Sequence, residues 1–174
     1  IEKRHSQGWV DVIISDLDEL VVRVRKAQEL NKIEAIGFNG NIVDVWEKFY
    51  AENIFIDIAS DQTSLHNPFD GGYFPNKMSF GEAVKLIKND HIEFKKNVQR
   101  TLREHVAIIN KHVERGTYFF DYGNAFLLEA KRAKAEILNN DGGFKYPSYV
   151  QDIMGPLCFD YGFGPFRWVC ASGK

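Results

Sequence analysis

The chain has 174 residues, of which 44% are hydrophobic and 26% are charged. This length and composition suit one globular domain and exclude a disordered or fibrous protein. Lysine and arginine number 22 against 24 aspartate and glutamate residues, so no basic excess points to nucleic acid as a partner. No run of about 18 apolar residues suggests a membrane span. Two cysteines cannot build a disulfide framework, which indicates a reducing compartment.

Both ends of the chain are unusual for a complete protein. The sequence begins at Ile1 without a methionine, and residues 1–5 lack the apolar stretch of a signal peptide. It ends on Ala171–Lys174, directly after an aromatic run. We therefore expect an excised piece of a longer protein.

The first sixty residues alternate between short apolar runs and helical patterns. Runs rich in β-branched and aromatic residues predict strands at 9–14, 33–38 and 54–59. Ser15 or Asp16 can cap a helix between the first two strands, and Asn41 can cap a helix that reaches Phe49. This alternation indicates βαβ units, and hence an α/β fold with a parallel sheet.

A long helical segment is predicted around 79–115. Ser79 and Glu82 have the spacing of a capping box. A helical pattern then runs from about residue 92 to 115 and stops at Gly116. A strand at 117–121 and a helix that reaches Ile137 are expected next, followed by an aromatic, glycine-rich part without a single period.

A polar loop, SDQTSLHNPFDGGYFP at 60–75, follows the third predicted strand. In open α/β sheets, ligands bind beyond the carboxyl ends of the strands. Gln62, Thr63, Ser64 and His66 carry groups that can hydrogen-bond a polar ligand such as a nucleotide. Alternatively, the hydroxyl groups serve the loop's own backbone. The residues alone leave both interpretations open.

The turn at 37–41, GFNGN, lies between a predicted strand and a predicted helix. Its backbone N–H groups could meet a phosphate or a ribose, although an ordinary tight turn explains the same residues and is favoured. The complete G-x-G-x-x-G fingerprint and the Walker A motif are both absent from the sequence.

Metal and nucleophile signals are weak. The five histidines lack metal-ligand spacing, and no C-x-x-C occurs. Cys158 and Cys170 are interpreted as inert, buried thiols. Arg167 stands among aromatic residues and glycines, a setting in which a guanidinium needs an anionic partner. A ligand carboxylate and a structural ion pair or cation–π contact remain equal alternatives.

Three motifs then occur in order: DQTSLHNP with GYFP at 61–75, FDYGN at 120–124 and GFGPFRW at 162–168. Together they closely resemble the urocanase (urocanate hydratase) family, and the resemblance covers essentially the whole chain. It implies a Rossmann-like, parallel sheet flanked by helices. Residues 1–145 would belong to the central NAD-binding domain, and residues 146–174 would return to the catalytic core.

The resemblance also implies a function. Urocanases are cytoplasmic, homodimeric lyases of histidine degradation that add water to urocanate, giving imidazolonepropionate. They use tightly bound NAD⁺ as an electrophile rather than as a hydride carrier. Residues matching the family's NAD contacts are Asn41, Ile42, Gln62, Thr63, Ser64, Leu65, His66, Tyr73, Phe74 and Tyr122. Arg167 matches the arginine near the substrate carboxylate.

The family's catalytic cysteine and its glycine-rich pyrophosphate loop have no counterpart in this sequence. No catalytic residue and no metal ligand is therefore assigned, and we expect the chain alone to be inactive, with weak or no NAD affinity. A non-catalytic module that binds a ligand or partner on the same scaffold is the alternative. An ordinary NAD-dependent dehydrogenase lacks support because the complete glycine fingerprint is missing.

Overall fold

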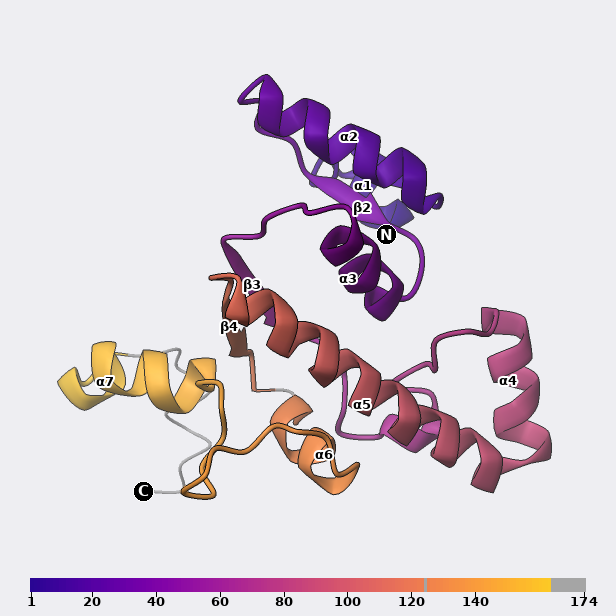
Figure 1. Cartoon of the computed structure of the whole chain (residues 1–174), viewed down its shortest axis with the longest axis vertical. Coiled ribbons are helices and arrows are strands. Elements are labelled where there is room, and N and C mark those ends of the chain that lie inside the picture. Colours follow the sequence, from indigo (N-terminus) through magenta and orange to yellow (C-terminus); the bar gives the residue numbers. More distant parts are fainter. Residues whose placement is uncertain (124, 164–174) are drawn as a thin grey trace.

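The computed structural model describes residues 1–123 and 125–163, which form an α/β protein (Figure 1). Its strands are β1 (Val12–Ile14), β2 (Ile36–Phe38), β3 (Ile58–Asp61) and β4 (Tyr118–Asp121). Its α-helices are α1 (Glu2–Ser6), α2 (Leu17–Glu29), α3 (Ile42–Ala51), α4 (Phe80–Asn89), α5 (His91–Glu114), α6 (Phe126–Arg132) and α7 (Gly155–Leu157). Three further helical segments of the described residues are not α-helical: the 3-10 turns η1 (Pro68–Asp70) and η3 (Phe159–Tyr161), and the π-helical turn η2 (Tyr149–Met154).

The described strands pair in parallel, as the α/β pattern predicts. β1 pairs with β2, with Ile14 opposite Phe38, and β3 pairs with β4, with Asp61 opposite Asp121. Helix α2 connects the first pair, and the long connection through α4 and α5 joins the second. The expected continuous sheet is therefore divided into two pairs within the described residues.

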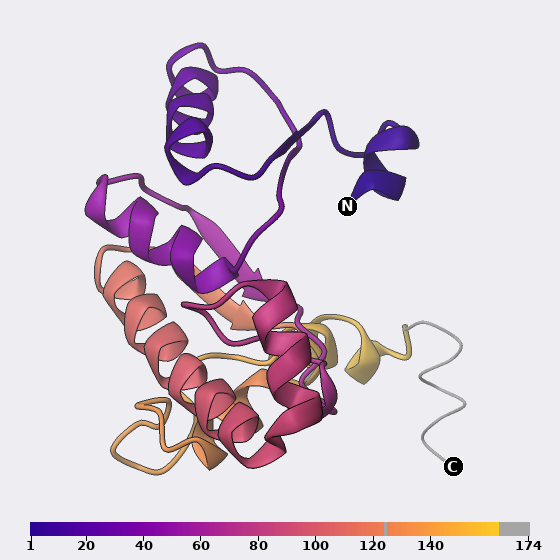
Figure 2. The same ribbon diagram turned by 90° about the vertical axis from the view of Figure 1, so that its right-hand side faces the viewer.

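Each pair of strands has its own apolar core. The smaller core contains Ile14, Leu20, Val21, Phe49 and Ile54, which pack between β1, α2 and α3. The larger core is built around α5, whose Phe94, Val98, Leu102, Val106 and Ile109 are completely buried. Figure 2 shows α3 and α5 lying alongside the second strand pair, with α4 folded back on α5.

Helix caps form where the sequence predicts them. Ser79 and Glu82 make the capping box of α4, and Asp16 and Asn41 cap α2 and α3. The long helical segment is confirmed, with Asp90 ending α4 and capping α5. A carboxylate at this position accepts the orphan N–H of Glu93, so two helices meet without a loop.

Several predicted elements differ from the structure in their bounds. The strands expected at 9–14 and 33–38 begin only at Val12 and Ile36, and two further elements differ more. The strand expected at 54–59 begins only at Ile58, because Asn53 takes a left-handed conformation and Ile54 turns into the smaller core. The helix expected to reach Ile137 stops at Arg132, since Lys134 is left-handed. Ile137 is apolar because the larger core buries it, not because it lies on a helix.

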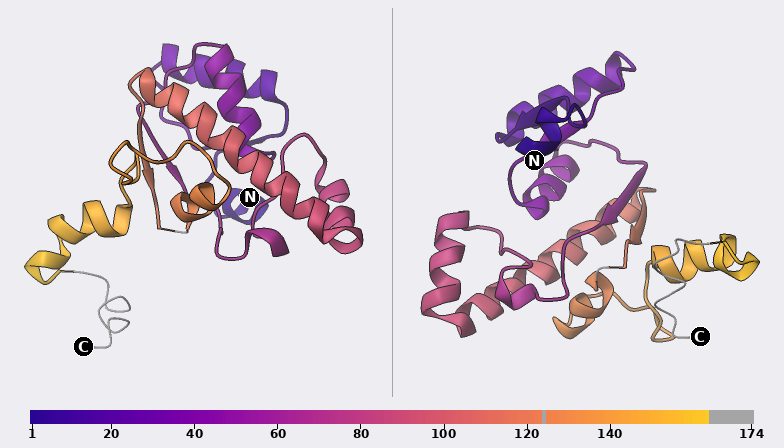
Figure 3. Two further views of the ribbon diagram at one scale, coloured as in Figure 1. Left: turned by 60° about the horizontal axis from the view of Figure 1, so that its bottom comes forward. Right: turned by 180° about the vertical axis from the view of Figure 1, so that it is seen from behind.

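The segment after residue 144 runs beside β4. Asp121 N–H donates to the Pro147 carbonyl over 2.9 Å, and Tyr146 packs on Phe119. Figure 3 shows η2 and α7 continuing on the β4 side, away from α4. The division at residue 145 stays a prediction.

Candidate cofactor site

Asp61 and Asp121 end β3 and β4 and face each other across the strand pair. Both carboxyl groups are buried. Burial raises the pKa of Asp61 to about 6, despite hydrogen bonds from Thr63, and Asp121 adds to the rise. Burial also raises the pKa of Asp121, and its Oδ1 has no hydrogen-bond partner among the described residues. The C-terminal ends of β3 and β4 therefore carry two buried carboxyl groups, one of which has an oxygen without a hydrogen-bond partner among the described residues.

Within the polar loop, residues 62–66 are of two kinds: some hold the loop in place and others point to solvent. Thr63 donates from its backbone N–H (3.1 Å) and its hydroxyl (2.6 Å) to one Asp61 oxygen, and the Leu65 side chain is completely buried. Ser64 and His66 are exposed, and their side chains make no hydrogen bond within residues 1–123 and 125–163. The loop thus holds its own shape and presents hydroxyl and imidazole groups outward.

Gly72 lets the loop close on itself. A Cβ added there would lie 2.4 Å from the Ser64 carbonyl oxygen and 2.6 Å from that of Asn67. The Gly72 N–H donates to the Asn67 carbonyl over 3.0 Å. Only glycine allows this approach, so the backbone of residues 64–67 is fixed by the GYFP segment that follows it.

Asn41 joins the turn after β2 to the loop after β3. Its Oδ1 accepts from Val43 N–H (3.0 Å) at the start of α3, and its Nδ2 donates to the Phe74 carbonyl (3.1 Å). Asn41 and Phe74 both line a pocket of about 520 Å³. Ile42 instead lines an apolar cavity of about 400 Å³ between α2, β2 and α3. The predicted pair Asn41 and Ile42 therefore faces two different cavities.

Tyr73 and Phe74 point their rings into the protein. The Tyr73 hydroxyl and His105 Nδ1 are 3.1 Å apart, and both side chains are buried. Burial raises the pKa of Tyr73 and lowers that of His105 to about 3. The Phe74 ring packs on Phe80 and Phe94. A ligand at the loop would therefore meet the backbone of Tyr73, not its hydroxyl group.

Tyr122 places an aromatic ring beyond β4. Its N–H donates to the Asp61 carbonyl over 3.2 Å, so the residue is tied to both strands. Its ring stacks on Tyr149, with centroids 5.1 Å apart and planes 10° apart. Next to it, a pocket of about 590 Å³ is lined by Asp121, Gly123 and residues 144–148 among others.

The structure thus brings together the turn after β2, the loop after β3 and the first residue after β4. Arg167 and Cys170 lie outside the described residues, and Cys158 is half-buried. No group of three or more potential metal ligands is found in the part that the structure describes. Within the same residues, no helix is long and apolar enough to cross a membrane.

The sequence reasoning missed two features of this site. Asp61 and Asp121 were not singled out, although aspartate is depleted within strands and here ends two of them. Asn76, completely buried behind the loop, was also missed. Its partners are 24 or more residues away in the sequence, so no local pattern reveals it.

The chemistry of these residues suits a nucleotide cofactor. The N-terminus of α3 favours negative charge, and the exposed hydroxyl and imidazole groups offer hydrogen bonds to ribose or phosphate. The unpartnered Asp121 oxygen can accept a hydrogen bond from a ribose hydroxyl or an amide.

Parallel strands linked by helices, with polar groups gathered at their carboxyl ends, define a Rossmann-like domain. The family model of the urocanase Rossmann-like domain matches residues 1–153, and the chain belongs to this family. A probable urocanate hydratase of Caenorhabditis elegans is 49% identical over 99% of the chain. A probable urocanate hydratase of Dictyostelium discoideum is 52% identical over the whole of this chain, and the urocanate hydratase of Mus musculus is 48% identical over 98% of this chain. The chain spans about a quarter (26%) of each relative's length.

Proposed function

We propose that this chain is the central part of a urocanate hydratase, a hydro-lyase that adds water to urocanate to give imidazolonepropionate. The relatives that carry this name match almost the whole chain. The observation that carries the proposal is the hydrogen bond from Asn41 to the Phe74 carbonyl, because it joins two loops that the family resemblance assigns to the cofactor. A cytoplasmic, homodimeric enzyme of histidine degradation belongs to the same proposal.

NAD is the cofactor in this proposal. Asn41 would set the start of α3 against the dinucleotide, and Gln62, Ser64 and His66 would hydrogen-bond it from the loop. Tyr122, fixed by the Asp61 carbonyl and by stacking on Tyr149, would close the site from the β4 side. Thr63 and Leu65 would act by shaping the loop. When bound, NAD would supply an electrophilic ring for the imidazole of urocanate.

No catalytic residue is proposed within the chain, and neither Cys158 nor Cys170 receives a role. We propose that Arg167 binds the substrate carboxylate through its planar guanidinium fork. The remaining catalytic groups would come from the other three-quarters of the protein, since the relatives are about four times longer. The isolated chain would then be inactive.

The test compares the full-length protein that carries this chain with the chain alone. Loss of the ultraviolet absorbance of urocanate and the NAD content of the purified protein are measured for both. Turnover and bound NAD with the full-length protein alone are expected. Turnover by the isolated chain would contradict the assignment of catalysis to other segments. The absence of both signals in the full-length protein would favour a non-catalytic binding module.

Arg167→Lys in the full-length enzyme tests the substrate contact. Lysine keeps the charge but loses bidentate pairing, so KM for urocanate should rise by about tenfold or more while the NAD content stays unchanged. Arg132→Lys is the matched control, because Arg132 is an exposed residue paired with Glu129 on α6. Equal kinetics for both variants would remove Arg167 from the substrate site.

A further inference from the structure

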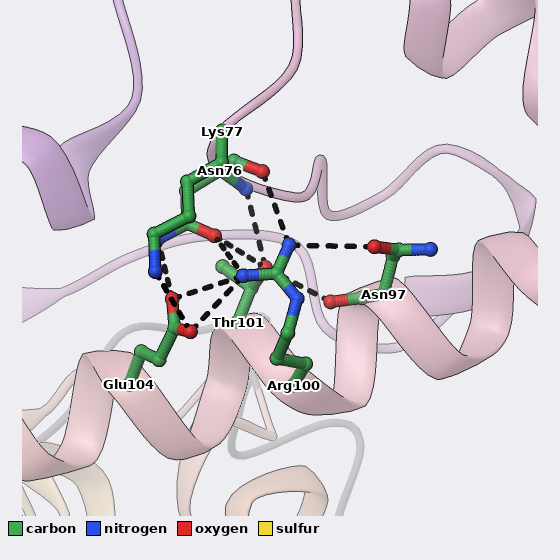
Figure 4. A network of polar contacts seen from close by, with 6 residues as sticks. All are labelled: Asn76, Lys77, Asn97, Arg100, Thr101 and Glu104. Atoms are coloured by element: carbon green, nitrogen blue, oxygen red, sulfur yellow. Dashed lines mark hydrogen bonds and ion pairs between the residues drawn. The ribbon is translucent and has the colours of Figure 1, made fainter.

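Asn76 is held entirely by helix α5. The residue is completely buried, and each of its four polar groups bonds to a side chain of that helix (Figure 4). Its N–H donates to Thr101 Oγ1 (3.2 Å) and its Nδ2 to Glu104 Oε2 (2.8 Å). Its Oδ1 accepts from Arg100 Nη1 (3.0 Å) and Thr101 Oγ1 (3.0 Å), and its carbonyl accepts from Arg100 Nη2 (3.3 Å).

The partners of Asn76 are themselves fixed on α5. Arg100 and Glu104 form an ion pair over 3.0 Å, one helical turn apart. Lys77 adds a second ion pair to Glu104 over 3.0 Å. Thr101 Oγ1 lies 2.9 Å from the Asn97 carbonyl, a second acceptor for its hydroxyl hydrogen. Because every polar group of Asn76 has a partner on α5, the cluster specifies one position of Asn76 relative to the helix.

Two further bonds fasten the residues just before Asn76. The Tyr73 hydroxyl meets His105 on α5, and the Phe74 carbonyl accepts from Asn41 at the start of α3. The segment 73–76 is therefore hydrogen-bonded to α5 through Tyr73 and Asn76, and to the N-cap residue of α3 through Phe74. These hydrogen bonds surround the backbone of Tyr73 and Phe74, which the family resemblance matches to NAD contacts.

We propose that four residues position the polar loop at 60–75 for the cofactor: Asn76, Arg100, Thr101 and Glu104. Asn76 is completely buried and all its polar groups are used, so it does not touch a ligand itself. It acts through the backbone at Tyr73 and Phe74, whose placement against the α3 N-terminus it sets. Binding sites tolerate errors of only about 0.5 Å, so loosening this cluster weakens NAD binding. This inference rests on the proposed function.

A matched pair of variants at Thr101 tests the role in the full-length protein. Thr101→Val keeps the shape but leaves the buried Asn76 N–H without its acceptor, whereas Thr101→Ser keeps the hydroxyl. NAD dissociation constants are measured on the apoprotein by calorimetry, well below the melting temperature of the least stable variant. We expect Thr101→Val to weaken NAD binding by about tenfold, and Thr101→Ser to stay within about threefold of wild type.

Ile109→Val is the control for a general loss of core packing. Ile109 lies on the same helix and is completely buried, but its aliphatic side chain cannot hydrogen-bond the loop. It should lower the melting temperature and leave NAD binding within about threefold of wild type. Equal affinities for Thr101→Val and Thr101→Ser, or an equal loss with Ile109→Val, would overturn the positioning role alone. A wild-type protein that does not bind NAD would overturn the proposed function and this inference with it.

Discussion

Asp61 is a buried carboxyl group that lies opposite a second one, Asp121. Its ionised form is disfavoured first by burial and then by that neighbour, although two hydrogen bonds from Thr63 oppose the effect. The folded protein keeps the proton up to a pKa of about 6, whereas the unfolded chain releases it near 3.8. Between these values the folded state binds more protons, so this group makes stability fall as pH rises.

Asp61→Asn should remove this pH dependence. The amide oxygen can still accept from Thr63, and no charge is buried. At pH above 6 the variant should be more stable than wild type, by about 1–3 kcal/mol, and below pH 4 the difference should vanish. Urea unfolding at a series of pH values measures it. Parallel stability curves for the two proteins would show that Asp61 is not the titrating group.

Gly72 shows how one residue without a side chain sets the loop. Gly72→Ala places a Cβ 2.4 Å from a backbone oxygen that has no room to move freely. We expect a loss of about 1–3 kcal/mol in unfolding free energy and weaker NAD binding. Gly81→Ala is the control: nothing lies within 4 Å of its added Cβ, and in α4 alanine should stabilise by about 0.5–1 kcal/mol. Equal behaviour of both variants would refute the close approach.

At the scale of elements, Asn41 links a helix and a loop through different atoms. Asn41→Asp keeps the Oδ1 that caps α3 but loses the Nδ2 that donates to the Phe74 carbonyl. Asn41→Ala loses both. The free energy of unfolding should fall by about 1 kcal/mol in Asn41→Ala, because the cap is lost, and should remain near the wild-type value in Asn41→Asp.

NAD binding by the full-length protein should separate the two roles of Asn41. Both variants should bind NAD more weakly, because both lose the bond between the α3 turn and the loop. Calorimetric titration of the apoproteins measures this. An aspartate variant with wild-type affinity would show that the Phe74 bond does not matter for the cofactor.

The elements predicted from sequence are those with local causes. Caps such as Asp16 and Ser79 depend on residues three positions apart, and the long apolar stripe of α5 depends only on its own period. The start of β3 was predicted four residues too early, because an apolar run does not reveal where a linker ends and a strand begins. Ile137 misled the helix prediction because burial by distant residues gives the same apolar signal.

The candidate site shows the same difference between features with local causes and features that depend on distant residues. The polar loop could be located, because its composition and its place after a strand are visible in the sequence. The sequence does not predict which side chains of the loop face outward. Their direction depends on the hydrogen bond from Thr63 to Asp61 and on the burial of Leu65. The cluster around Asn76 depends on a helix that begins 15 residues later, and no spacing predicts which face of that helix meets the loop.

At the scale of the whole molecule, the two apolar cores differ in size. The smaller core, between β1, α2 and α3, has five buried residues, whereas the larger one is more extensive and includes buried residues of α5, β4 and α6. Helix α3 contributes to both, through Phe49 on one side and Trp46 on the other. Local opening follows the smaller buried area, so the part around α2 should open before the part around α5.

Hydrogen exchange with a pair of core variants tests this order. Leu20→Ala in the smaller core should remove about 2–5 kcal/mol and speed amide exchange in residues 12–38, leaving the protection of α5 unchanged. Leu102→Ala in the larger core should speed exchange throughout both parts, because α3 needs α5 as its support. The β2 turn with Asn41 lies at the boundary, so Leu20→Ala should loosen the α3 side of the candidate site while the Asn76 cluster keeps its protection. Equal acceleration in α5 by Leu20→Ala would show that the two cores unfold as one.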